Sequence, residues 1–227
     1  MRGRSRILRK SVYVSPADPG RGLLPTIYDL KPKFQALLRP FCTRLAAAGV
    51  TANQVTLIAC GLSLAHGAAH MTQPGAKWVL ALLPFVLFAR MALNAIDGML
   101  AREFGQASRL GAILNELTDV ISDAALYLPF AFIPGLPAPL VVVAVLSGVI
   151  AEMTGAVAIQ IGASRRYDGP FGKSDRAFFF GALALLLVFF DPGRWSSVLI
   201  AFACALGAGT IVNRARQALK EARNADP

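Results

Sequence analysis

Six long apolar stretches follow one another along the chain, and short polar connections separate them. They cover residues 54–72, 78–97, 109–131, 138–163, 175–191 and 195–213. A helix of about 20 apolar residues crosses the hydrocarbon core of a bilayer, and the fifth stretch is the shortest of the six. Hydrophobic residues make up 55 % of the chain and charged residues 16 %, which is more apolar side chain than one soluble core needs. We therefore predict an all-α integral membrane protein with six transmembrane helices.

The basic side chains are distributed unevenly around these stretches. If successive connections alternate across the membrane, 21 of the 23 Lys and Arg residues lie on one side, and Lys77 and Arg194 lie on the other. Cytoplasmic loops of membrane proteins are enriched in Lys and Arg. The distribution predicts a multi-pass protein of the plasma (inner) membrane with both termini in the cytoplasm. It also explains the net charge of +10 better than nucleic-acid binding does.

The rest of the chain divides around this region. Residues 1–27 are basic and contain several Pro and Gly residues, which predicts a mobile cytoplasmic tail. Residues 28–50 repeat apolar side chains at helical spacing with basic ones between them, which predicts an amphipathic juxtamembrane helix on an anionic membrane surface. Packing against another protein element would give the same pattern. Residues 51–215 then form the six-helix transmembrane domain, and residues 216–227 form a second cytoplasmic tail.

The richest polar cluster surrounds the connection between the second and third stretches. Asn94 and Asp97 are three residues apart and therefore share one face of a helix. On the next helix, residues spaced by four form one stripe: Gly111, Asn115, Asp119 and Asp123. Both segments lie near the predicted cytoplasmic boundary, so we expect their oxygen atoms to converge there. Ionisable residues in a membrane span are costly and usually functional.

This set of side chains indicates a particular chemistry. Clustered carboxylate and amide oxygens are hard ligands, which suit Mg²⁺ or Mn²⁺. One or two such ions beside Arg102 would suit a phosphate or diphosphate group. The small residues Gly98, Ala101 and Gly111 would allow a ligand or a helix to approach closely. A polar network between helices, without a ligand, is the alternative interpretation.

The cluster resembles the signature of a known family, the CDP-alcohol phosphatidyltransferases. The matching pattern is Asp97-Gly98-x₂-Ala101-Arg102-x₈-Gly111-x₃-Asn115-x₃-Asp119. The six-stretch layout, the amphipathic helix and residues 49–56 are also similar to that family. The family usually has aspartate where this chain has Asn94 and Asn115, so the motif is a variant. The resemblance implies that Asn94, Asp97, Asn115 and Asp119 hold the metal, that Asp119 is also the catalytic base, and that Gly98, Ala101, Arg102 and Gly111 contact the nucleotide and its phosphates.

The same resemblance implies an activity. It implies a membrane enzyme of phospholipid synthesis that transfers a phosphatidyl group from a CDP-linked lipid, most simply CDP-diacylglycerol, to the hydroxyl of a polyol or polyol phosphate. CMP is released, Mg²⁺ or Mn²⁺ is the cofactor, and the protein forms a homodimer. Because two carboxylates are replaced by amides, the alternative is a non-catalytic family member that binds lipid or nucleotide. A cation transporter is disfavoured, because transporter sites usually lie near the middle of the membrane.

Three further acidic residues are candidates for an auxiliary role. Asp123 and Glu116 lie close to the motif and can supply the charge that the two amides lack. Glu152 lies in the middle of the fourth stretch, where it either lines a cavity or pairs with a group on another helix. His66 and His70 lie four residues apart near the outer end of the first stretch. A solvated helix end is the favoured interpretation for them, and a metal site is the alternative.

A basic cluster occupies the connection between the fourth and fifth stretches. Its members are Arg165, Arg166, Lys173 and Arg176. We expect them to bind the phosphate of the acceptor, since they lie on the same side of the membrane as the acidic cluster. The alternative is that these charges only set the topology. Gly172-Lys173-Ser174 is not a P-loop, because Tyr167 stands where the first glycine of that motif would be.

Overall fold

The computed structural model describes residues 27–225, and the side chains of residues 34–224. The predicted mobile tail, residues 1–27, therefore lies outside the described residues except for its last residue. The described part of the chain is helical and contains no strand. Its α-helices are α1 (Ile27–Ala47), α2 (Ala52–Thr72), α3 (Lys77–Glu103), α4 (Arg109–Tyr127), α5 (Ala138–Val157), α6 (Lys173–Phe189) and α7 (Arg194–Ala225). Short 3₁₀ helices follow α4 (η1, Leu128–Phe132) and α5 (η2, Ala158–Ile161).

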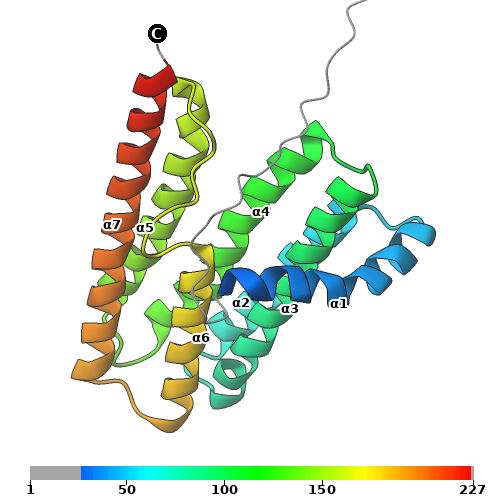
Figure 1. The fold of residues 1–227 in the computed structure, drawn as a ribbon. Coiled ribbons are helices and arrows are strands. Elements are labelled where there is room, and N and C mark those ends of the chain that lie inside the picture. Colours follow the sequence, from blue (N-terminus) through cyan, green and yellow to red (C-terminus); the bar gives the residue numbers. More distant parts are fainter. Residues whose placement is uncertain (1–26, 226–227) are drawn as a thin grey trace, which may run out of the picture.

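Four of these elements are long and apolar enough to cross a membrane: α2, α3, α5 together with η2, and α7. The all-helical class is thus confirmed, while six crossings stay a prediction for α4 and α6. α4 carries several charged side chains, and α6 has 17 residues. In Figure 1 the chain after η2 descends along the α5–α7 pair, and α6 begins only after this descent. The predicted second tail begins as a continuation of α7, which runs to Ala225.

The helices pack in an arrangement that leaves a polar region between them. α2 packs against α3 and α4, α5 packs against α7, and α3 packs against α6. Two glycines permit close approaches between helices. A Cβ atom at Gly67 of α2 would lie 2.3 Å from the carbonyl oxygen of Ala125 in α4, and one at Gly207 of α7 would lie 2.2 Å from Ser147 Oγ in α5. Close packing through small residues is typical of helices in membranes.

We expect Gly67→Leu to lower the thermal stability of the detergent-solubilised protein. The added side chain would meet backbone of α4 that cannot rotate away, and overpacking of this kind typically costs about 1–3 kcal/mol. Gly61→Leu is the matched control, because Gly61 is exposed on the same helix and no atom of the described residues lies within 4 Å of its Cβ position. The measurement is the midpoint of thermal unfolding. Equal midpoints for the two variants would contradict the close packing of α2 on α4.

Apolar side chains form one large cluster below this polar region. Tyr127 and Phe180 stack with ring centroids 4.2 Å apart, and Phe130 packs edge-on against Phe180. The ring of His70 lies 5.0 Å from that of Phe130. His66 and His70 are 5 % and 0 % exposed, and their nitrogens have no hydrogen-bond partner among the described residues. The interpretation of these histidines as a solvated helix end was therefore wrong.

α1 packs on α3 and carries apolar side chains both at this contact and on its outward side. Cys42 is buried in a cluster with Met99 of α3, and Leu38 and Leu45 pack against the same cluster. Leu37 is 75 % exposed and Phe41 is 50 % exposed, so a second apolar face of α1 points outward. One face of the helix thus contacts protein, as the alternative interpretation of its pattern required. The outward face leaves room for contact with a membrane.

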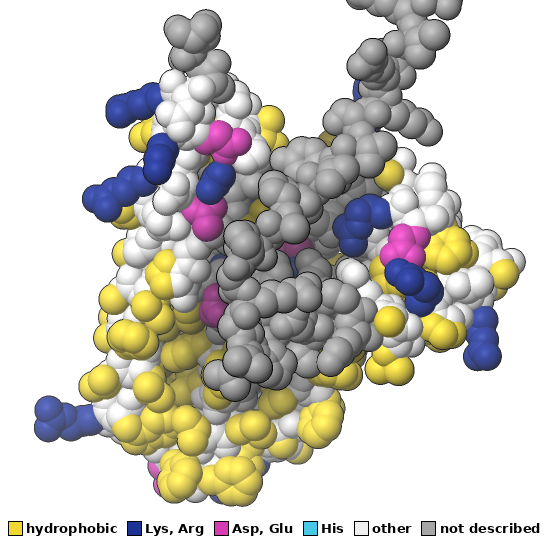
Figure 2. All heavy atoms as spheres, in the orientation of Figure 1, with side chains coloured by type: hydrophobic (Ala, Val, Ile, Leu, Met, Phe, Trp, Pro, Cys, Tyr) yellow, Lys and Arg dark blue, Asp and Glu magenta, His cyan; other side chains and the backbone are white. Residues whose placement is uncertain are grey.

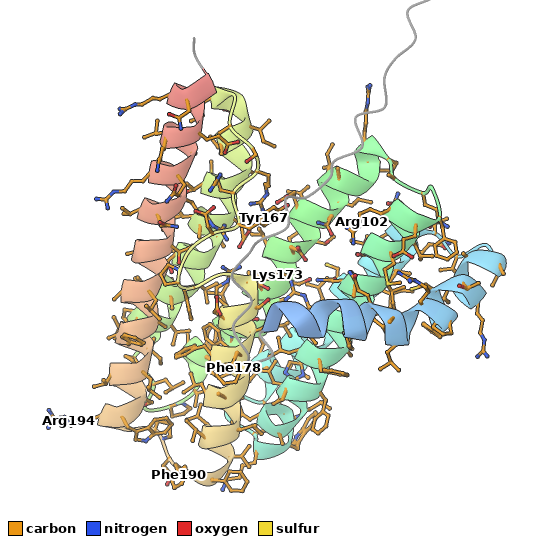
Figure 3. The ribbon with its side chains drawn as sticks, in the orientation of Figure 1. Arg102, Tyr167, Lys173, Phe178, Phe190 and Arg194 are labelled. Carbon is orange, nitrogen blue, oxygen red and sulfur yellow. The ribbon has the colours of Figure 1, made fainter. Side chains whose placement is uncertain are left out.

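The surface divides by polarity. Figure 2 shows apolar side chains over the lower part of one face and most Lys and Arg side chains toward its upper part. The upper end includes the end of α7, where Arg216, Lys220 and Arg223 are exposed. Arg194 lies at the opposite end, which is also the end where Figure 3 labels Phe190. This distribution agrees with the one-sided placement of basic residues expected from the sequence.

Candidate functional site

Asp119 of α4 is held by donors from two other helices. Lys173 Nζ at the start of α6, Asn94 Nδ2 of α3 at 3.3 Å and Arg90 Nη2 of α3 at 3.5 Å all contact one carboxylate oxygen, Oδ1. Arg90 also donates to the main-chain oxygen of Asp119 at 3.0 Å. These contacts join α3, α4 and α6 at the acidic stripe, and they fix the orientation of the Asp119 carboxylate.

Asp97 lies on α3 one turn beyond Asn94 and is 5 % exposed. Its Oδ2 accepts a hydrogen bond of 2.7 Å from Thr56 Oγ1 of α2. Thr51 and Gln54 form a reciprocal capping box that stabilises the start of α2, the helix that carries Thr56. The segment 49–56, which the sequence indicated as part of the family pattern, therefore supports Asp97.

The small residues of the motif lie where side chains come close. A Cβ atom at Gly98 would lie 2.9 Å from Arg102 Nη2, so the guanidinium folds back over the glycine. A Cβ atom at Gly111 would lie 2.8 Å from Asn53 Oδ1, which brings the starts of α4 and α2 together. Arg102 is exposed and Ala101 is half-buried. In Figure 3, Arg102 lies near the end of α3, with α4 between it and Lys173 in that view.

A pocket of about 270 Å³ opens beside Asp119. It brings Asn115 and Asp119 of the acidic stripe together with Arg165 and Lys173 of the basic cluster. Tyr167 lines it as well, and Figure 3 shows Tyr167 and Lys173 in the region between the α5–α7 pair and α4. The two polar clusters singled out in the sequence, although more than 40 residues apart, therefore share one cavity.

Arg165 forms one wall of this pocket. Its guanidinium makes a two-pronged contact with Glu116 at 2.7 and 2.8 Å, reaches Glu152 Oε2 at 3.0 Å, and lies 4.5 Å from the centre of the Tyr167 ring. Burial disfavours its charged form, but the hydrogen bonds to Glu116 and Glu152 outweigh this effect and raise the pKa of Arg165 above its ordinary value. Arg165 is therefore a permanent cation with a fixed position.

A buried ion-pair network adjoins the pocket, and two of its members, Glu152 and Arg214, line it. Asp123 of α4 accepts from Arg90 at 2.5 Å and from Arg176 of α6 at 2.9 Å. Glu152 of α5 contacts Arg176 at 3.0 Å and Arg214 of α7 at 3.3 Å. The arginines are 1–3 % exposed, so they depend on these carboxylates for compensation. The network ties α3, α4, α5, α6 and α7 together beside the site.

The candidate auxiliary carboxylates are thus all paired with arginines. Glu116 pairs with Arg165, while Asp123 and Glu152 belong to the buried network. The members of the basic cluster are also divided, because Arg165 and Lys173 line the pocket and the other two do not. Arg166 pairs with Asp168 at 2.8 Å and Glu221 of α7 at 2.7 Å, and Arg176 is buried in the network.

Sequence reasoning missed three residues that hold the site. Arg90 and Arg214 were counted only as topology-setting charges, and Thr56 was noted only as part of a segment. A signal for Arg90 was present, because it falls inside the predicted span 78–97, where a cation requires an anionic partner. Arg214 gave a weaker signal at the end of its span, yet it is 1 % exposed and donates to the Ala151 carbonyl oxygen at 2.6 Å.

The donor types of the motif are those that a hard divalent cation prefers, and of its four members Asn115 and Asp119 line the pocket while Asn94 and Asp97 do not. No group of three or more His, Cys, Asp and Glu side chains gathers as a metal site within residues 27–225. The donor set expected from the motif is instead two carboxylates and two amides: Asp97, Asp119, Asn94 and Asn115. Mg²⁺ is commonly held by one or two carboxylates together with water and substrate phosphate oxygens. The side chains present therefore suit a cation that shares its coordination sphere with a phosphorylated substrate.

Comparisons with known proteins agree with this chemistry. The family model described as CDP-alcohol phosphatidyltransferase matches residues 49–209. The inner membrane protein YnbA of Escherichia coli (strain K12) is 49 % identical over 197 residues, which cover 86 % of this chain and 96 % of that protein. A phosphatidylinositol phosphate synthase of Corynebacterium glutamicum is 34 % identical over 93 residues, or 41 % of each protein. The alignment thus spans less than half the length of that synthase.

Solved structures share the fold. The phosphatidylinositol phosphate synthase of Mycobacterium tuberculosis, solved in complex with manganese and citrate, superposes with a TM-score of 0.68 at 23 % identity, over 83 % of this chain and 91 % of that one. The same synthase with CDP-DAG bound superposes with a TM-score of 0.63 at 23 % identity, over 83 % of this chain and 96 % of that one. At this level of identity the likeness concerns the fold.

Proposed function

The chain belongs to the CDP-alcohol phosphatidyltransferase family, and we propose that it transfers a phosphatidyl group from CDP-diacylglycerol to the hydroxyl of a phosphate-bearing acceptor. The observation that carries this proposal is the pocket that Asp119 shares with Lys173 and Arg165. A base and two cations in one cavity suit an acceptor that presents a hydroxyl at one end and a phosphate at the other. The structural relative with CDP-DAG bound supports the donor, and the relatives named phosphatidylinositol phosphate synthase support the acceptor class.

The charge of the pocket makes a divalent cation necessary for this reaction. The lining carries four carboxylates and three cationic side chains, which are Glu116, Asp119, Glu152, Asp175, Arg165, Lys173 and Arg214. Such a pocket has no excess of positive charge for an anionic substrate. Asp97 and Asp119 would hold a divalent cation, which would offset the excess of carboxylates and supply the charge that polarises the donor diphosphate and stabilises the departing CMP. The manganese in the structural relative supports this assignment.

Each side chain of the site has its own role in the proposed transfer. Asp119 accepts the proton of the acceptor hydroxyl, whose oxygen attacks the phosphorus that carries the diacylglycerol. The bond between that phosphorus and the bridging oxygen breaks, and CMP leaves with the electron pair. Lys173 and Arg165 hold the phosphate of the acceptor by charge-assisted hydrogen bonds. Gly98, Ala101 and Arg102 are proposed to receive the nucleotide and its phosphates, because glycine and alanine leave room beside the guanidinium.

The membrane arrangement belongs to the same proposal. α4 and α6 complete six crossings in the multi-pass protein, both termini face the cytoplasm, and the outward face of α1 lies on the anionic inner surface of the membrane. CDP then reaches the site from the cytosol while the acyl chains of the donor stay in the bilayer. This division explains why the polar site lies at the basic end of an otherwise apolar helix bundle.

A direct assay tests the proposed reaction. Purified protein is incubated with CDP-diacylglycerol, Mn²⁺ or Mg²⁺, and separate acceptors: glycerol 3-phosphate, an inositol phosphate, serine, an uncharged polyol and a phospholipid. CMP release is measured, and the lipid product is identified by mass spectrometry. We expect product only with metal and a phosphate-bearing acceptor. CMP release with an uncharged acceptor alone would reject the acceptor class, and no CMP release in any mixture would favour the non-catalytic alternative.

Neutralising the cations of the pocket is expected to weaken acceptor binding. Lys173→Met and Arg165→Gln each remove a charge-assisted contact worth about 1.5–3 kcal/mol, so the KM for the acceptor should rise about tenfold or more. The KM for CDP-diacylglycerol should change little. Arg166→Gln is the control, because Arg166 lies in the same connection but pairs with Asp168 and Glu221. Equal acceptor KM values for Lys173→Met and Arg166→Gln would contradict the assignment.

The two amides of the motif are expected to respond differently to restoration of a carboxylate. Asn115 is exposed in the pocket, so Asn115→Asp adds an anionic ligand and should tighten Mn²⁺ binding. Asn94 Nδ2 donates to Asp119 at 3.3 Å, so Asn94→Asp replaces a donor by a like charge and should destabilise the metal-free protein. Mn²⁺ titration and thermal unfolding without metal provide the measurements. Weaker Mn²⁺ binding by Asn115→Asp, together with unchanged metal-free stability of Asn94→Asp, would show that the two amides have other roles.

A further inference from the structure

Lys173 occupies an unusual position for a cation. It is the first residue of α6, where the aligned peptide dipoles disfavour positive charge. The acidic residue that suits this helix end is already present, because Asp175 accepts a hydrogen bond of 2.8 Å from the main-chain nitrogen of Gly172. Lys173 instead extends across to α4 and contacts Asp119 Oδ1. The position of the Lys173 ammonium group is therefore explained by its ion pair with Asp119 and not by an interaction with the end of α6.

The donors that surround Asp119 Oδ1 differ in their freedom to move. Arg90 has a side chain that is 4 % exposed, and it is fixed by Asp123 at 2.5 Å. Asn94 is neutral, so it does not balance the charge of the carboxylate. The side chain of Lys173 is 33 % exposed and borders the 270 Å³ pocket. Lys173 is therefore the cation that can leave Asp119 without breaking the buried network.

We propose that Lys173 is an internal counter-ion at the metal site, and that a divalent cation on Asp119 displaces its ammonium group into the pocket. This inference rests on the proposed function, since it takes Asp119 as a metal ligand. Lys173 balances Asp119 before the metal arrives and moves away when the metal takes its place. Metal binding and the Lys173–Asp119 ion pair exclude each other, so by linkage each weakens the other by the same factor. The ion pair therefore lowers the affinity for metal, and bound metal releases Lys173.

Metal affinity provides the first test. Mn²⁺ binding is measured by electron paramagnetic resonance on the full-length protein in detergent, for the wild type, Lys173→Met and Lys220→Met. We expect Lys173→Met to bind Mn²⁺ about tenfold more tightly or better, because it loses a competing charge-assisted contact. Lys220 is exposed on α7, so Lys220→Met should match the wild type. Binding by Lys173→Met alone would also support the inference.

Equal Mn²⁺ affinity of the wild type and Lys173→Met would overturn the inference and leave the metal site of the proposed function standing. Absence of Mn²⁺ binding in all variants would overturn both. The two failures are therefore distinguishable in one experiment.

The reactivity of the wild-type amine provides the second test and requires no substitution. The protein is treated briefly with an amine-acylating reagent with and without Mn²⁺, and labelling of each lysine is measured by mass spectrometry. Release from Asp119 should increase labelling of Lys173 several-fold when Mn²⁺ is present, while Lys220 should be unaffected. Unchanged or reduced labelling of Lys173 in protein that binds Mn²⁺ would overturn the proposed displacement.

Discussion

Asp119→Asn is expected to reduce CMP release by about a thousandfold or more, because the proposed mechanism uses this side chain both as the base and as a metal ligand. The amide cannot accept the proton of the acceptor hydroxyl, and it is a weaker, uncharged metal ligand. The substitution keeps the shape of the side chain, so the donors from α3 and α6 keep a carbonyl oxygen to contact. The loss should therefore appear in turnover, while the protein remains folded.

The control for Asp119→Asn is Asp191→Asn. Asp191 is exposed in the connection between α6 and α7, at the end of the molecule away from the site, so the same chemical change there should leave turnover unaltered. Asp97→Asn separates the two roles proposed for Asp119, because Asp97 is proposed to be a metal ligand and not a base. Excess Mn²⁺ should restore part of the activity of Asp97→Asn and none of that of Asp119→Asn. Near-normal turnover of Asp119→Asn would refute the assignment of the site.

The helices and the acidic stripe could be predicted because they depend on local spacing. The four-residue interval does put Asn115, Asp119 and Asp123 along one face of α4, and hydrophobic runs mark the long helices. The roles within the stripe could not be predicted in this way. Asp119 reaches the pocket, whereas Asp123, one turn further along, is paired with Arg90 and Arg176. Those partners come from α3 and α6, and no spacing within α4 reveals them.

The roles of the residues in the basic cluster could not be predicted from local spacing either. Lys173 and Arg176 are three residues apart at the start of α6, and their spacing provides no reason to assign them different roles. Lys173 faces the pocket, but Arg176 is 2 % exposed and lies between Asp123 and Glu152. The difference arises because Arg176 lies one turn further along α6, where Asp123 of α4 and Glu152 of α5 enclose it. Burial at this helix end is therefore set by helices that are distant in the sequence and not by the local pattern.

Glu152→Gln is expected to destabilise the protein by about 3–5 kcal/mol, the range typical when one partner of a buried ion pair is removed. Glu152 lies between Arg165, Arg176 and Arg214 at 3.0, 3.0 and 3.3 Å. The amide carries no negative charge, so the positive charges of three neighbouring, largely buried guanidinium groups are no longer fully balanced. Thermal unfolding in detergent measures the effect. Glu103→Gln is the control, because Glu103 pairs with Arg39 at the surface, where such pairs contribute about 1 kcal/mol or less.

The same substitution distinguishes a structural role of Glu152 from a positioning role. Arg165 forms the wall of the pocket and depends on both Glu116 and Glu152 for its place. If Glu152 positions Arg165, Glu152→Gln should raise the KM for the acceptor in the fraction that remains folded, with little change in kcat, and Glu152→Asp should recover part of both properties because it keeps the charge. If Glu152 only stabilises the bundle, the folded fraction should show an ordinary KM. Thermal stability equal to that of Glu103→Gln, together with an unaltered KM, would mean that the buried network neither stabilises the fold nor shapes the pocket.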